Sequence, residues 1–115
     1  MDGVESIRGG EGAWNAAVSI VEPGVVLAGR NPVRTDAVCM AVMGFDPMAD
    51  RGTPPFETSD NTLRLAEDVG IGTRDLNRIE VIGTRIKEAL FDFAAIRRQR
   101  RLLSQAREGR KNKQP

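Results

Sequence analysis

Residues 23–47 read PGVVLAGRNPVRTDAVCMAVMGFDP, and this stretch decides the fold that we expect for the chain. It begins with Val25–Ala28, an apolar run without polar alternation, which predicts a strand covered on both faces. Asn31 is a good N-cap for a helix over Val33–Met43, and Gly44 supplies a left-handed stop. A strand, a short turn and an apolar helix in this order favour an α/β layer.

Weaker patterns on either side predict further elements. Val18–Val21 and Ile79–Ile82 are short, apolar and β-branched, so both read as strands. Asn61–Val69 has an apolar side and a glycine after it, which predicts a helix. The connection from Val25 to Ile79 is long enough for a parallel crossover. We therefore expect an α/β fold, with a small mixed or parallel sheet flanked by helices, in an incomplete domain.

Composition narrows the classes of function. The chain has 115 residues, room for one domain, and contains no histidine, the commonest metal ligand and neutral-pH base. Its single cysteine, Cys39, lies in an apolar run and reads as a buried small hydrophobe. We therefore expect neither a cofactor nor a metal. The sequence has neither a membrane-spanning apolar run nor a signal peptide, so a reducing cytoplasm is the default location.

The charge is unevenly distributed along the chain. Residues 1–96 carry 9 basic and 15 acidic side chains, whereas residues 97–115 carry 8 basic and 1 acidic. We expect residues 1–92 to form the α/β domain, and residues 93–115 to form a basic amphipathic helix with a disordered tail. Asp92 is a fair cap for this helix. The candidate partner-binding residues on that helix are Arg97, Arg98, Arg100 and Arg101.

Such a helix suits an acidic protein, an anionic membrane surface or nucleic acid. No aromatic residue follows Phe93, which makes base stacking, and hence nucleic acid, the weaker alternative. A plainer interpretation packs the apolar side of this helix on the domain and leaves the arginines in water.

A second candidate site surrounds the turn before the first helix. Free N–H groups at a helix start favour anions, so a small anionic ligand is one interpretation of this turn. Its candidate residues are Asp36, Asn31, Arg30, Gly9, Gly10 and Gly12. Asp36 enters an otherwise apolar helix, where a carboxylate needs hydrogen bonds. A structural alternative stays open, in which Asn31 only caps the helix and Asp36 only fastens neighbouring backbone.

These residues resemble a known family. VVLAGRNPVRTDAVCMAVMGFDP at residues 25–47, LRLAEDVGIGTRDLNRIEVIG at 63–83 and DGVESIRGGEG at 2–12 are similar to the C-terminal part of domain-of-unknown-function family 362. The resemblance implies the C-terminal portion of a larger α/β domain of unassigned activity. Some members carry ferredoxin-like iron–sulfur modules, but their cysteines have no counterpart here. The family's usual Gly-Pro is replaced by Gly12 and Ala13.

Two functions follow as expectations. The first is a ligand-binding or redox-associated α/β domain fragment, whose site lies where the glycine loop, the turn before the first helix and Asp36 converge. The second is a non-enzymatic module that binds an acidic partner or nucleic acid through its basic C-terminal helix. In either case we expect a homo-oligomer or a missing N-terminal portion. Neither interpretation specifies a substrate or a reaction, and whether the chain is an enzyme stays open.

Overall fold

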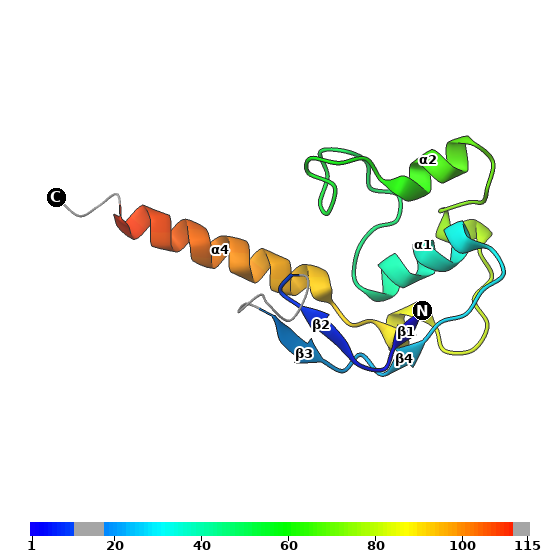
Figure 1. Ribbon diagram of the computed structural model, residues 1–115, viewed down its shortest axis with the longest axis horizontal. Helices are drawn as coiled ribbons and strands as arrows, with labels where there is room; N and C mark the ends of the chain where they lie inside the picture. The colour runs from blue at the N-terminus through cyan, green and yellow to red at the C-terminus, as the bar shows by residue number, and fades with distance from the viewer. Residues whose placement is uncertain (11–17, 112–115) are drawn as a thin grey trace.

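A computed structural model of the chain describes residues 1–10 and 18–111, apart from the side chains of residues 94, 96–101 and 111. The described residues form a small mixed α/β domain with one long helix projecting from it (Figure 1). Its elements are β1 (Asp2–Gly3), β2 (Ser6–Arg8), β3 (Ser19–Val21), β4 (Val25–Val26), α1 (Pro32–Val42), α2 (Thr62–Asp68), the 3-10 helix η1 (Leu76–Arg78), α3 (Ile86–Ala89) and α4 (Phe93–Lys111). The predicted α/β class, with helices beside a small sheet, is confirmed.

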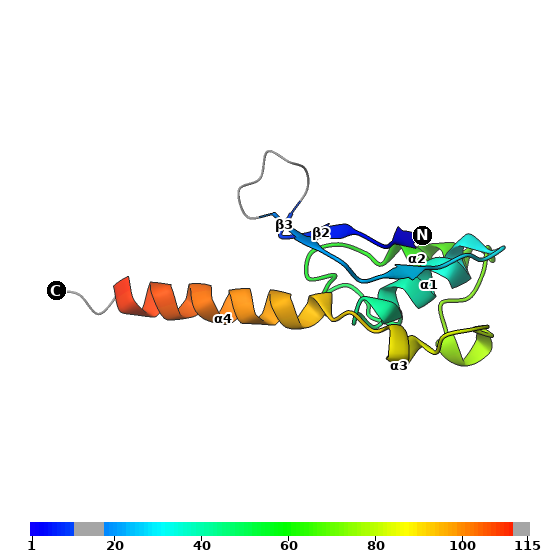
Figure 2. The same ribbon diagram turned by 90° about the horizontal axis from the view of Figure 1, so that it is seen from below.

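The strands form two small antiparallel ladders. β1 pairs with β4 and β2 pairs with β3, so the two ladders follow one another along a single bent hairpin (Figure 2). The expected parallel pairing of Val25 with Ile79 is therefore wrong. The hairpin joins residues that are closer in sequence than the crossover would, so closing its loop costs less entropy. Residues 79–82 are not assigned as a strand, and the predicted strand at Val25–Ala28 shortens to Val25–Val26.

Helix α1 begins and ends within one residue of the predicted bounds, at Pro32 and Val42. The side chain of Asn31 accepts from the backbone N–H of Arg34, and Pro32 occupies the first turn. Gly44 follows with φ of 84°, in the left-handed region that glycine tolerates. The all-round apolar character of the helix reflects cover on several sides, because it contacts α2, η1 and α3.

The core lies between α1 and the segment that follows it in the chain. Val33 and Ala37 of α1 pack against Leu63 of α2, with Leu76 and Ile79 beside them. This cluster fixes the start of the 79–84 segment against α1. Another side of α1 is left for residues 23–30, which lie along the same helix.

Helix α4 leaves the domain at Phe93 and extends away from it in both views (Figures 1 and 2). The carboxylate of Asp92 accepts from the N–H of Ala95 at 2.8 Å, which confirms the predicted cap. Leu102 and Leu103 are 67% and 57% exposed, so these two residues do not pack on the domain. Among the described residues, no helix has both the length and the apolar character needed to span a membrane.

Candidate functional site

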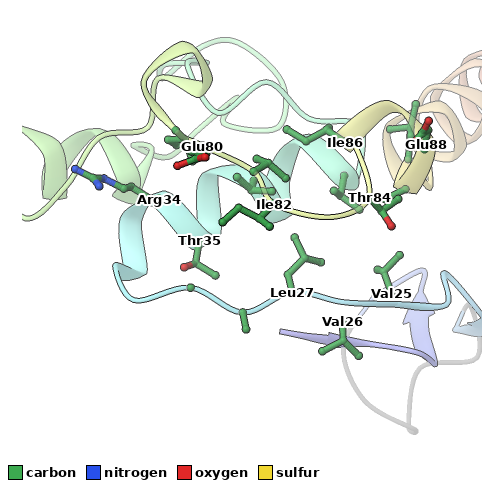
Figure 3. Close-up of a pocket in the computed structure, with 18 of the residues that line it drawn as sticks. Val25, Val26, Leu27, Arg34, Thr35, Glu80, Ile82, Thr84, Ile86 and Glu88 are labelled. Atoms are coloured by element: carbon green, nitrogen blue, oxygen red, sulfur yellow. The ribbon is translucent and has the colours of Figure 1, made fainter.

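A groove of about 810 Å³ runs over helix α1 (Figure 3). Residues 23–30 form one wall and residues 79–84 line the other, with α1 as the floor; α3 and Leu90 lie at one end. We call this space the α1 groove. Residues 23–30 and α1 follow one another in the sequence, whereas residues 79–90 come much later in the chain.

The middle of the α1 groove is apolar. Val25 and Leu27 point from the first wall toward the facing segment, whereas Val26 points the other way (Figure 3). Val38 and Val42 of α1 line the floor and are themselves buried. An extended chain points successive side chains to opposite faces, which explains why Val26 points away from the facing segment while its two neighbours point toward it.

Two arginines mark the end of the α1 groove at the start of α1. Arg30 and Arg34 line it there, both are exposed, and neither forms an ion pair with another described residue. Glu80 lines the groove from the facing wall near Arg34 (Figure 3). Two guanidinium groups against one carboxylate leave this end net positive, which favours an anionic group.

Asn31 fixes the geometry of this end. Its Oδ1 accepts from the Arg34 N–H at 3.0 Å, and its Nδ2 donates to the carbonyl oxygen of Ile71 at 2.7 Å. The Thr35 hydroxyl donates to the Asn31 carbonyl oxygen, also at 2.7 Å. The role of Asn31 as a cap is confirmed, and its role toward a ligand stays a prediction. With one amide N–H already used, its capacity for a ligand is small.

Asp36 does not behave as a buried acid. It is exposed, and it does not line the α1 groove. Its carboxylate is open to water and so does not require the hydrogen bonds that a buried acid needs, and its role toward a ligand stays a prediction. Cys39 is buried as expected, and burial raises the pKa of its thiol, with the nearby Asp36 charge adding to the effect.

The other predicted residues lie away from this end. Gly9 and Gly10 have φ of 101° and 133° and follow β2, at the opposite end of the hairpin from the start of α1 (Figures 1 and 2). They do not converge with Asp36, which corrects that expectation. Gly12 lies outside the described residues, as do the side chains of Arg97, Arg98, Arg100 and Arg101 on α4.

A buried polar network was missed from the sequence. Asn61 is 1% exposed, and its Nδ2 donates to the carbonyl oxygens of Pro47 and Ala49 at 2.8 and 2.9 Å. The Nη1 of Arg74, also buried, approaches the same two oxygens at 3.3 and 3.4 Å. The partners lie 12 to 27 residues apart, so no local sequence pattern predicts these contacts.

Glu67 completes this network from α2. Its Oε2 accepts from the backbone N–H of Arg74 at 2.8 Å and from the Thr73 hydroxyl at 3.0 Å. These two bonds, the Arg74 bond first, lower the pKa of the Glu67 carboxyl. The network holds the 46–50 loop against α2 and serves structure, since none of its members lines the α1 groove.

Among the described residues, no group of three or more cysteine or acidic side chains is placed to hold a metal ion. Comparisons of the chain with family models, with curated proteins and with solved structures found no match. The resemblance to domain-of-unknown-function family 362 therefore stays a prediction.

Proposed function

We propose that this chain is a ligand-binding α/β domain, a portion of a larger domain resembling family 362, and that its ligand occupies the α1 groove. The observation that carries the proposal is the pair of arginines, Arg30 and Arg34, at one end of a groove whose middle is lined by valine and leucine side chains. The ligand then has an apolar body and an anionic group. The volume of about 810 Å³ suits such a ligand, since sites for small molecules span about 300–1,000 Å³.

Neither guanidinium group forms an ion pair with another described residue. Each makes planar, charge-assisted hydrogen bonds to carboxylate or phosphate, and the start of α1 adds partial positive charge. Placing an anion there relieves the repulsion between the positive charges of Arg30 and Arg34. The single free cysteine is in keeping with a cytoplasmic location, which belongs to the same proposal.

The test measures binding of inorganic phosphate and of succinate by backbone amide NMR. We expect saturable shifts at residues 30–35, weakened roughly tenfold or more when Arg30→Ala and Arg34→Ala are combined. Arg78→Ala is the matched control, because Arg78 is exposed and does not line the groove. The proposal is rejected if neither anion shifts these amides, or if the double variant binds both as the wild type does.

A second candidate function has its own observation: α4 projects from the domain and belongs to a segment with 8 basic and 1 acidic residues. On this proposal the helix binds an acidic protein or nucleic acid. Deleting residues 97–115 should abolish salt-sensitive binding to polyglutamate or to a labelled oligonucleotide. Equal binding by the truncated and full chains at low salt would remove this candidate.

A further inference from the structure

The edge of β4 that is not paired with β1 carries free backbone groups. Met1 and Leu27 exchange two hydrogen bonds, with the Met1 amino group donating to the Leu27 carbonyl at 2.7 Å and the Leu27 N–H donating to Met1 at 2.9 Å. In an antiparallel ladder, the residues beside such a pair direct their backbone groups to the opposite edge. The N–H and C=O groups of Val26 and Ala28 therefore turn away from β1, and none bonds to another described residue.

The facing wall is open in the same way. Ile79 is extended, with φ of −118° and ψ of 122°. The backbone groups of Glu80, Val81 and Ile82 form no hydrogen bond with any part of the chain that the structure describes. Ile82 is 88% exposed, although its neighbour Ile79 packs in the core. The two walls run in opposite directions along α1 (Figure 3).

Two open edges on either side of an apolar floor are complementary to one extended chain. Added to β4, such a chain satisfies backbone groups that otherwise depend on water, and its alternate side chains reach the floor. A second copy of β4 does not fit this description, because its other edge is already paired with β1. The occupant needs two free edges, which a single extended segment has.

We propose that the α1 groove takes an extended polypeptide segment, which adds to β4 as a third strand. Its inward residues are apolar and contact the floor at Val38 and Val42. An acidic residue at one end meets Arg30 and Arg34, where Glu80 is the acidic side chain that lines the groove from the facing wall. This last contact rests on the proposed function, since it uses the same anion-binding end, whereas the backbone pairing does not.

The probe is an acetylated hexapeptide that alternates threonine and valine and ends in glutamate. We expect saturable binding, with the largest NMR shifts at the amides of Val26 and Ala28 and slower hydrogen exchange there. A matched peptide, N-methylated at alternate residues, loses the donors of one edge and should bind roughly tenfold more weakly. Equal binding of the two peptides would overturn strand addition.

A protein variant tests the same edge. Ala28→Pro removes an N–H that faces the groove and keeps the Met1–Leu27 pair. This variant should weaken binding of the hexapeptide roughly tenfold and leave phosphate binding unchanged. If phosphate binds but the hexapeptide does not, strand addition fails and the proposed function stands. If neither binds, both fail; if Ala28→Pro does not fold, the N-methylated peptide decides the question.

Discussion

The side-chain amide of Asn31 ties the start of helix α1 to the loop after α2, through a 2.7 Å hydrogen bond from its Nδ2 to the carbonyl oxygen of Ile71. The next residue, Gly72, lies directly against the same amide, and a Cβ built there collides with the Asn31 side chain. The absence of a side chain at residue 72 thus allows the cap of α1 to form. Two segments about 40 residues apart are joined at this point.

The first prediction follows from this contact. Gly72→Ala should displace the Asn31 amide, break its bonds to Arg34 and Ile71, and lower the free energy of unfolding by about 1–2 kcal/mol. Urea unfolding followed by circular dichroism measures the change. Gly109→Ala in α4 is the control, since its added Cβ meets nothing within 4 Å. Similar losses in both variants would mean that the Asn31 contact is not responsible.

A second prediction concerns acid stability. The pKa of Glu67 is lowered from 4.5 in the folded state, so the unfolded chain binds more protons near that pH. Glu67 therefore adds stability above about pH 4.5, and this contribution disappears as the pH falls through the lowered value. Urea midpoints of the wild type and Glu67→Gln should differ most near neutral pH and converge in acid.

The control for this series is Glu5→Gln. Glu5 is exposed and makes no hydrogen bond or ion pair with a described residue. Its urea midpoint should track that of the wild type at every pH. A constant gap between wild type and Glu67→Gln from pH 3 to pH 7 would contradict the assigned bonds.

Cys39 gives a third prediction. Its thiol is buried and its pKa is raised, so little thiolate exists near neutral pH. Ellman's reagent at pH 8 should react slowly with the native chain and rapidly once guanidinium unfolds it. Fast labelling of the native chain would show that α1 is not covered at Cys39.

The fourth prediction tests the independence of α4. Deleting residues 97–115 should change the free energy of unfolding by less than about 0.5 kcal/mol, because the exposed leucines of this helix make no core. Deleting residues 91–115 should cost more, since it also removes the backbone bonds from Phe91 to Val42 and from Phe93 to Met43. Thermal unfolding compares the two. A large loss in the shorter deletion would place part of α4 against the domain.

The sequence predicted local features correctly where they depend on residues close together in the chain. The caps at Asn31 and Asp92 and the stop at Gly44 were all predicted, because each depends on chemistry within a few residues. The strand at Val18–Val21 also appears, as β3. These features needed no knowledge of tertiary contacts.

Pairing between segments was not predictable in the same way. The apolar run at Ile79–Ile82 has the composition of a strand, but no described strand pairs with it. A segment with strand-like composition becomes a strand only when a neighbouring strand pairs with it. For the candidate site, the sequence placed Arg30 and Asn31 correctly at the turn, and it missed the facing wall because that wall lies some 50 residues away.

The bond between the Met1 amino group and Leu27 has a practical consequence for handling the protein. β1 runs antiparallel to β4, so residues fused before Met1 would continue along Ala28 and Gly29 toward Arg30. A purification tag at that terminus would bring foreign chain to the mouth of the groove and turn the ammonium group into an amide. Binding experiments with this chain therefore call for a C-terminal tag, or for cleavage that leaves Met1 as the first residue.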